Sequence, residues 1–446
     1  MPPGSHARRA VSRVARLPRP RFIEWRTLVL SPFSPRARVP TDLDAVTRIR
    51  GGAEAEPHEA GVEPGARDRI WRAARRLYQS GIHPGLALCV RRNGRVLLDR
   101  AIGHVRGNGP GDPPDGAVQI TPDSPFVTLS ASKAVTAMVI HLLDQQNLLH
   151  LDDPVCEYIP EFAAHGKQWI TIRHVLIHRA GIQNLPPEAL QLPSLEDTNA
   201  VVQMIAAQRP SGRAGRQLAY HAITGGFVLG EVVRRITGKS IRTVLDETLR
   251  RPLGFRWLGY GVTPAEVSEV VTNYLTGPPP FPPFSTLFRR ALGVGYQEVV
   301  TISNEPRFLT GVVPAGNVVA TANEMSRFFQ LLLDGGVLDG VRVFEPRTVR
   351  RATLEHSYLE VDFTLGVPFR YGMGFMLGAD WLSPYGPYTD KAFGHLGFTN
   401  IICWADPERR VAAALLTSGK PFLYPELYHL FELLRQIGLT CPKDPG

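Results

Sequence analysis

The sequence predicts an α+β fold, an α/β sandwich in which an antiparallel sheet is flanked by helices and carries an inserted, mostly helical lobe. Three observations indicate it. A hairpin near the start joins residues 85–90 to residues 95–101 across Asn93-Gly94, a dipeptide that favours two-residue turns. A second hairpin around Asp406-Pro407-Glu408 lies near the end, and the long middle is mostly helical in pattern. We expect the active site between the sheet and the lobe.

The same pattern divides the chain. Residues 1–60 are predicted to be a basic, flexible N-terminal extension, and residues 61–446 one folded domain. In that domain a sheet lobe takes about 61–120 and 341–446, and a helical lobe takes about 121–340. Helices are expected over residues 68–78 and, at the end of the chain, over about 425–436.

The most informative segment is Ser130-Ala131-Ser132-Lys133, which precedes an apolar run that reads as a buried helix. Residues three apart share a helix face, so the Ser130 hydroxyl and the Lys133 amine can meet. The positive end of the helix dipole disfavours an ammonium there, which would let Lys133 accept the Ser130 proton. Taken alone, S-x-x-K is also typical of an exposed helix turn. The chain has only six lysines, which makes a chance match less frequent.

The segments around this motif extend the pattern. Residues 121–126 lead into the serine, residues 148–162 follow its helix, and residues 170–182 come next. From about Gly85 to Thr417, the order of these segments resembles the serine β-lactamase and penicillin-binding-protein superfamily. The similarity is to the branch that holds class C β-lactamases, D-alanyl-D-alanine carboxypeptidases and β-lactamase-like (family VIII) carboxylesterases. It implies the β-lactamase/transpeptidase-like fold.

The resemblance assigns Tyr220 to the second motif, Y-x-N in the family. Alone, such a tyrosine is more often a core aromatic. In the family role its phenol relays a proton beside Lys133, a task for which we expect its pKa to be lowered from about 10 by a nearby cation. Ala222 stands where the family has asparagine, a residue that helps β-lactamases hold the amide side chain of the antibiotic. This change argues against β-lactam hydrolysis.

The third motif of the family, K-T-G or H-x-G, aligns with His395, Leu396 and Gly397, on what the resemblance implies is an edge strand. Alone, such a histidine is more often a surface group at a strand end. By resemblance, the backbone N–H groups of Ser130 and Phe398 form the oxyanion hole, with His395 beside it. A histidine is a poorer anchor for a carboxylate than the β-lactamase lysine, which favours neutral esters.

Composition excludes several classes of function. The net charge of +9 is concentrated in residues 1–50, with eleven arginines against three acidic residues, so no nucleic-acid surface is expected on the catalytic body. No apolar run is long enough to span a membrane, and no secretory signal is recognisable, so we expect a cytoplasmic protein; the alternative is a transit peptide. The four cysteines are widely spaced and predict buried thiols.

One insertion stands out at residues 278–284, a proline run followed by a short basic amphipathic stretch to residue 292. The plain interpretation is an exposed connector stiffened by proline. The alternative is a lid or acyl-chain wall beside Ser130 that also contacts lipid peripherally.

The functional hypothesis is a serine hydrolase that cleaves a small-molecule carboxylic ester through a Ser130 acyl-enzyme, with Lys133 and Tyr220 as general acid and base and no metal or cofactor. Two alternatives stay open: a D-alanyl-D-alanine carboxypeptidase or weak β-lactamase, and a non-catalytic scaffold or sensor. The sequence leaves the physiological substrate and the oligomeric state open.

Overall fold

The structure, a computed structural model, describes residues 34–113, 115–185 and 197–444. The predictions made for residues 1–33 therefore lie outside the described residues.

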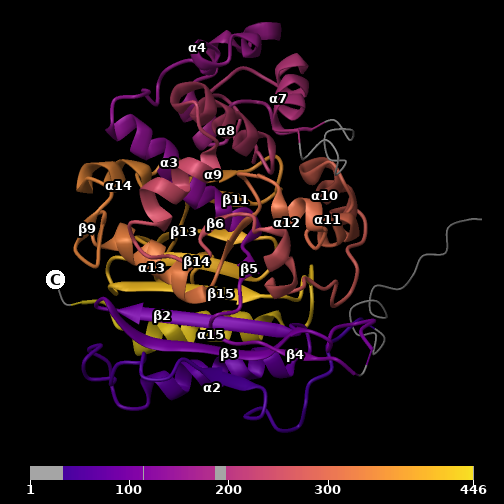
Figure 1. Ribbon diagram of the computed structural model, residues 1–446, viewed down its shortest axis with the longest axis vertical. Helices are drawn as coiled ribbons and strands as arrows, with labels where there is room; N and C mark the ends of the chain where they lie inside the picture. The colour runs from indigo at the N-terminus through magenta and orange to yellow at the C-terminus, as the bar shows by residue number, and fades with distance from the viewer. Residues whose placement is uncertain (1–33, 114, 186–196, 445–446) are drawn as a thin grey trace, which may run out of the picture.

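One antiparallel sheet organises the described part of the chain, in the order β1-β3-β2-β15-β14-β13-β12-β11-β10, with β4 pairing β3 off this path (Figure 1). The two ends of the chain meet where β2 pairs with β15. Both predicted hairpins are present, β2–β3 and β14–β15, and the α+β fold is confirmed. The strands are β1 (Thr47–Ile49), β2 (Gly85–Arg92), β3 (Arg95–Arg106), β4 (Val118–Gln119), β10 (Ser357–Val361), β11 (Pro368–Tyr371), β12 (Met376–Leu377), β13 (Phe393–Gly397), β14 (Ile401–Asp406) and β15 (Val411–Thr417).

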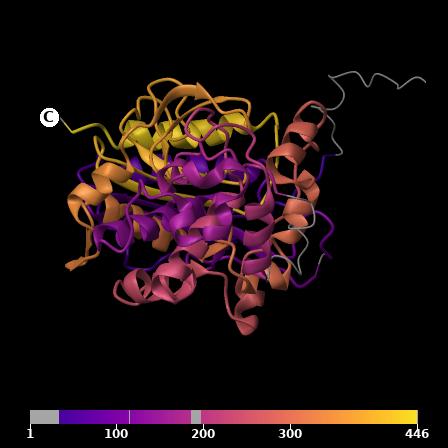
Figure 2. The same ribbon diagram turned by 90° about the horizontal axis from the view of Figure 1, so that it is seen from above.

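Both faces of the central strands are buried. Along β2, Leu86, Leu88 and Val90 face one core, which α2 (Ala66–Gln79) and α15 (Leu427–Thr440) complete. Ala87 and Cys89 face the other core, which holds the helices of the middle lobe. These strands therefore read as continuous apolar runs rather than alternating ones. Figure 2 shows α15, in yellow, on one side of the sheet and the magenta helices of the lobe on the other.

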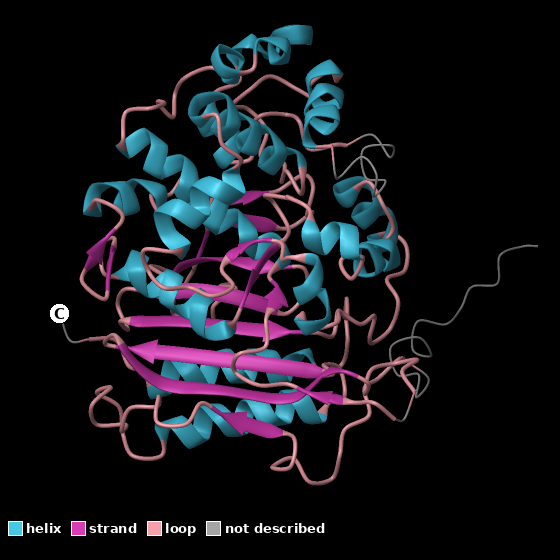
Figure 3. Ribbon diagram, viewed as in Figure 1, coloured by secondary structure: helices cyan, strands magenta, loops and turns pink. Residues whose placement is uncertain are grey.

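The middle of the chain supplies most helices, which gather above the sheet in Figure 3. It also holds a small three-stranded sheet, β5-β7-β6, and a β8–β9 hairpin, whose strands of two or three residues are too short for a readable alternation. None of the helices in the described ranges is long and apolar enough to cross a membrane. The remaining elements are β5 (Phe126–Val127), α3 (Ser132–Gln145), α4 (Val155–Tyr158), α5 (Ile172–Leu176), α7 (Thr198–Ala207), α8 (Thr224–Thr237), α9 (Ile241–Leu245), β6 (Gly259–Tyr260), α10 (Phe284–Leu292), α11 (Tyr296–Ile302), α12 (Pro306–Thr310), β7 (Val318–Ala320), α13 (Ala322–Leu333), β8 (Val337–Leu338), β9 (Val341–Arg342) and α14 (Pro346–Ala352).

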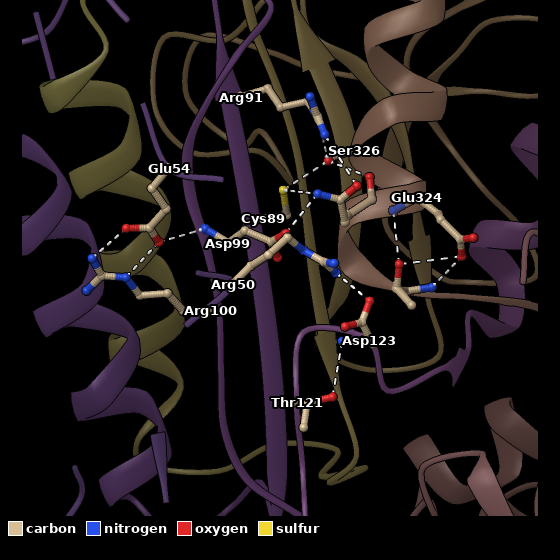
Figure 4. A network of polar contacts seen from close by, with 12 residues as sticks. Arg50, Glu54, Cys89, Arg91, Asp99, Arg100, Thr121, Asp123, Glu324 and Ser326 are labelled. Carbon is tan, nitrogen blue, oxygen red and sulfur yellow. Dashed lines mark hydrogen bonds and ion pairs between the residues drawn. The ribbon is translucent and has the colours of Figure 1, made fainter. Parts of the chain in front are cut away.

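Residues 34–60 are part of the packed body, so the boundary predicted at residue 60 lies too late in the chain. β1 pairs with β3, and Ala60 is fully buried. Figure 4 shows the polar contacts that hold this segment: the Glu54 carboxylate accepts from Arg100 at 2.7 and 2.8 Å, and Arg50 Nε donates to Asp99 at 2.6 Å. Composition predicted an extension because it records the arginines of residues 1–50 but not the buried carboxylates that pair with some of them.

We expect Glu54→Ala to lower the free energy of unfolding by about 3 kcal/mol, because it leaves the buried Arg100 guanidinium without its carboxylate. Only 7% of the Glu54 side chain and 10% of the Arg100 side chain are exposed. The matched control is Glu63→Ala, which breaks the ion pair between Glu63 and Arg69. Because the Glu63 side chain is 81% exposed, this substitution should change the free energy of unfolding by less than ~1 kcal/mol. Urea unfolding followed by circular dichroism measures both. Equal, small effects would mean that residues 34–60 do not contribute to the folded body.

Candidate active site

Ser130 lies at the junction between β5 and α3. The chain turns there at Leu129, whose φ of +50° is in the left-handed region, and passes through a 3₁₀ turn over Leu129–Ala131. A left-handed non-glycine residue costs roughly 1–3 kcal/mol, a strain that the packing around it must offset. The helix expected to include Ser130 begins two residues later, at Ser132. Ser130 is therefore half-buried at the start of the helix rather than inside it.

Lys133 is the residue that the sequence predicts beside Ser130, and the structure brings the two side chains together. Its Nζ lies 3.2 Å from Ser130 Oγ and 3.0 Å from the carbonyl oxygen of Ala315. No carboxylate pairs with it among the described residues. Burial lowers the pKa of Lys133 to about 7, so the amine is largely neutral slightly above neutral pH and can accept a proton.

Tyr220 approaches the same pair. The Lys133 amine lies 4.8 Å from the centre of the Tyr220 ring, and the phenol hydrogen-bonds to Ser130. Burial raises the pKa of Tyr220 above its usual value, and the hydrogen bond to Ser130 offsets this only in part. The expectation of a lowered phenol pKa is therefore wrong. A buried lysine that is itself largely neutral supplies little charge to lower it, so Tyr220 is a protonated donor.

Three buried groups that sequence reasoning missed surround Tyr220. The Asp362 carboxylate accepts from the Tyr220 backbone N–H at 3.0 Å and from the Tyr371 hydroxyl at 3.1 Å. The His178 ring lies 4.7 Å from the Tyr220 ring, centre to centre, and burial holds the pKa of His178 well below its ordinary value. Asp362 is 142 residues from Tyr220, and no local pattern signals the contact. His178 lies in the segment 170–182, whose place in the motif order was its only signal.

The third motif lies on β13, which is not an edge strand as expected. β14 flanks it on one side, and β12 on the other pairs only with Phe393 and Gly394. Because β12 is two residues long, the half from His395 to Gly397 has no strand partner on that side within the described sheet. The free half of the strand faces the 3₁₀ turn that carries Ser130: a Cβ placed on Gly397 would lie 2.5 Å from the Thr128 carbonyl oxygen. Glycine is therefore required at this close approach.

His395 is neutral in this environment. It is 1% exposed, and burial, followed by the proximity of Lys133, lowers its pKa to about 3. Its Nδ1 lies 2.7 Å from the Leu396 carbonyl oxygen, which can only accept, so Nδ1 carries the proton. The unprotonated Nε2 is then a hydrogen-bond acceptor, and the ring centre lies 6.3 Å from that of Tyr220.

A pocket opens beside Ser130, with about 630 Å³ of empty space including the part open to solvent. Its lining is almost wholly apolar, and no charged side chain contributes to it. The lining residues are Leu129, Ser130, Ala222, Ile223, Val294, Val299, Ile302, Ser303, Phe308, Val313, Ala315, Gly316 and Phe398. Ser130 and Phe398, expected to supply the oxyanion amides, thus line one cavity.

The insertion after residue 278 leads directly to this pocket. The Phe288 ring on α10 lies 6.3 Å from the Phe398 ring, and the Tyr296 ring at the start of α11 lies 4.7 Å from it. Val299 and Ile302 of α11 line the pocket themselves. The helical part of the segment therefore packs beside the site through Phe288, whereas Pro279, Pro282 and Pro283 of the proline run are exposed.

Comparisons with known proteins agree with this geometry. Residues 72–430 match the family model described as Beta-lactamase. The "Esterase/beta-lactamase LipL" of Mycobacterium tuberculosis is 32% identical over 315 residues, 68% of this chain and 71% of that protein. A penicillin-binding-protein homologue from Caulobacter crescentus superposes with a TM-score of 0.72 at 26% identity, over 84% of this chain and 98% of its own. A family VIII carboxylesterase, with the same coverage, gives 0.69 at 25% identity.

The Lys133 pKa predicts how the reactivity of Ser130 depends on pH. Below about 7 the amine is protonated and cannot accept the serine proton, so the rate of labelling by a fluorophosphonate probe should fall about tenfold per pH unit, and above it should level off. Intact-protein mass spectrometry measures this rate. His395→Gln is the control, because a group whose pKa is about 3 does not titrate in this range and the midpoint should stay. A midpoint that disappears with His395→Gln would assign the titration to the histidine.

Proposed function

The chain belongs to the beta-lactamase family and is a serine hydrolase, and from this premise we propose that it cleaves carboxylic esters through an acyl-enzyme on Ser130. The names of two similar proteins, an esterase/beta-lactamase and a family VIII carboxylesterase, support the choice of ester substrates.

The observation that carries the proposal is the pocket beside the serine, because its lining has no charged side chain. An apolar cavity favours an uncharged acyl group, whose transfer from water is driven by the hydrophobic effect. Phe398, Ile302 and Phe308 supply much of its bulk. A neutral ester with an aliphatic acyl chain is the substrate class that this environment accommodates best.

The same surroundings argue against a β-lactamase or a D-alanyl-D-alanine peptidase. Both classes act on substrates that carry a carboxylate, which needs a cation or a set of donors. His395 is neutral, and its one ring proton, on Nδ1, is donated to the Leu396 carbonyl oxygen. Ala222 has no side-chain amide. A carboxylate placed here would lose its hydration without compensation.

In the proposed mechanism, Ser130 Oγ attacks the ester carbonyl carbon while neutral Lys133 accepts the serine proton. The backbone N–H groups of Ser130 and Phe398 stabilise the oxyanion that forms. The Tyr220 hydroxyl then donates its proton to the departing alkoxide and regains one from the Lys133 ammonium. Water then attacks the acyl carbon and loses a proton to Lys133, and this proton passes to Ser130 Oγ as the bond between the serine and the carboxylic acid breaks. The high pKa of Tyr220 suits this donor role, because its phenol stays protonated until the leaving group needs it.

The insertion completes the substrate side of the proposal. Val299 and Ile302 form a wall of the pocket, and Phe288 and Tyr296 support Phe398 from behind. We propose that the acyl chain of the ester packs against this wall. The segment after residue 278 then helps to select the length of that chain.

The direct test compares the wild type with Ser130→Ala on p-nitrophenyl butyrate, nitrocefin and a peptide ending in D-alanyl-D-alanine. We expect butyrate turnover in the wild type and a loss of at least ~10³-fold in the variant, with an acyl adduct on the wild type alone by mass spectrometry. Nitrocefin or peptide cleavage faster than ester cleavage would favour the β-lactamase or peptidase alternative. A folded wild type that neither turns over nor forms an adduct would favour the scaffold alternative.

The acyl wall makes a separate prediction about chain length. Ile302→Trp should fill part of the pocket and lower kcat/KM for an octanoate ester relative to acetate by about tenfold or more, because the longer chain loses its space. The control is Leu354→Trp, a position that is 59% exposed and outside the pocket lining. Measurements of both esters with one leaving group, p-nitrophenol, isolate the acyl side. An octanoate-to-acetate ratio unchanged by Ile302→Trp would remove this wall from the acyl site.

A further inference from the structure

A second cavity is lined by residues of α9, β6 and α12, among others, and has a chemical character opposite to that of the pocket at Ser130. Figure 1 labels these three elements. It has about 1210 Å³ of empty space, counting the part open to solvent. Thr310 lines this cavity, whereas Val313, Ala315 and Gly316, a few residues further, line the one at Ser130. The two cavities are therefore separate, on either side of one backbone segment.

The lining of the second cavity carries excess positive charge. Four arginines contribute to it, against two carboxylates, those of Asp246 and Glu266. The arginines are Arg242, Arg250, Arg251 and Arg256. Because the cavity walls exclude part of the solvent, like charges gathered there raise the local concentration of anions.

The two carboxylates are already engaged. Asp246 is shared between two guanidinium groups, accepting from Arg250 at 2.7 Å and from Arg251 at 2.5 Å. The Glu266 carboxylate accepts from the backbone N–H and the hydroxyl of Thr263, at 2.9 and 2.7 Å. The four guanidinium groups exceed the two lining carboxylates, so the lining keeps an excess of positive charge, which the ion pair of Arg256 with Glu269 at 3.5 Å reduces but does not cancel.

Arg242 is held in place without any carboxylate. Its Nε donates to the Tyr260 carbonyl oxygen at 2.6 Å, and one Nη donates to the carbonyl oxygens of Thr310 and Gly311. These contacts fix the plane of the guanidinium but leave its charge unpaired within the described residues. The N–H groups of its other Nη have no acceptor among the described residues and can donate to an oxygen of a carboxylate or phosphate.

Arg256 is more exposed than Arg242, with 67% of its side chain accessible to solvent. Its guanidinium lies 4.7 Å from the centre of the Trp257 ring, and its nearest carboxylate, Glu269, is at 3.5 Å. The Arg256 carbonyl oxygen accepts from Arg250 at 2.6 and 3.0 Å. Arg250 and Arg256 are thus linked to each other, and the cation–π contact keeps the second from moving freely.

We infer that this cavity binds a small, multiply charged oxyanion, a phosphate or a polycarboxylate, between Arg242, Arg250 and Arg256. The proposal does not depend on ester hydrolysis, since the cavity is separate from Ser130 and the ligand need not react.

The test is isothermal titration calorimetry of the full chain at low salt, with inorganic pyrophosphate and, separately, citrate. We expect one site per chain, weakened about tenfold or more by Arg242→Gln and by Arg256→Gln, because each removes charge-assisted hydrogen bonds. Arg95→Gln, an exposed arginine at the start of β3 outside this cavity, is the control and should change nothing. Binding of pyrophosphate alone would assign a phosphate ligand, binding of citrate alone a carboxylate, and binding of both the shared oxyanion chemistry.

The variants keep the test decisive if one of them fails to fold. Arg242 holds three backbone carbonyls, so Arg242→Gln could unfold the region, whereas Arg256 has a side chain that is 67% exposed and serves as the surface variant. The inference is overturned if neither anion binds the wild type. It is also overturned if Arg256→Gln binds as tightly as the control variant Arg95→Gln does.

Discussion

The site depends on one constraint, the burial of the Lys133 amine away from any carboxylate. Transfer of an ammonium into such a place is costly unless it is paired, and the cost falls when the amine releases its proton. Among the described residues, the hydrogen-bond partners of the amine are the Ser130 hydroxyl and the Ala315 carbonyl, both of which a neutral amine can contact. Without a counter-ion, a buried lysine is an unfavourable core residue. For the same reason its pKa falls to about 7, so the amine can act as a base near neutral pH.

The fold holds this amine by fixing the start of α3 from several sides. Ser132 Oγ accepts from the Val318 backbone N–H at 2.9 Å, which ties the first turn of the helix to β7. One turn further, Thr136 contacts the Tyr260 hydroxyl at 2.7 Å and donates to the Pro314 carbonyl at 2.6 Å. The helix is buried along almost its whole length, so it cannot shift without opening the core. The left-handed Leu129 is tolerated because these contacts determine the path of the chain on both sides of it.

What the sequence could predict was local. The hairpins at Asn93-Gly94 and residues 406–411 follow from turn residues and strand patterns within a dozen residues, and the Ser130–Lys133 pair follows from helix geometry. What it could not predict depends on contacts between distant segments. β10 to β12 extend the sheet beyond β13, which places the third motif inside it, and Asp362 reaches Tyr220 from the loop that follows β10. The pKa of Tyr220 was mispredicted for a similar reason, because burial is a property of the assembled core and not of a motif.

The backbone between Thr310 and Val318 contributes to both cavities and contacts the Lys133 amine. Its first residues accept from Arg242, and a few residues later Ala315 accepts from Lys133. Asn317 holds the segment in a fixed path, because its side chain donates to Phe308 and Gly311 and accepts from the Val313 backbone N–H at 2.8 Å. The Ala315 carbonyl lies on this same short segment, so the Arg242 guanidinium and the Lys133 amine are both anchored to backbone carbonyls that Asn317 holds in place.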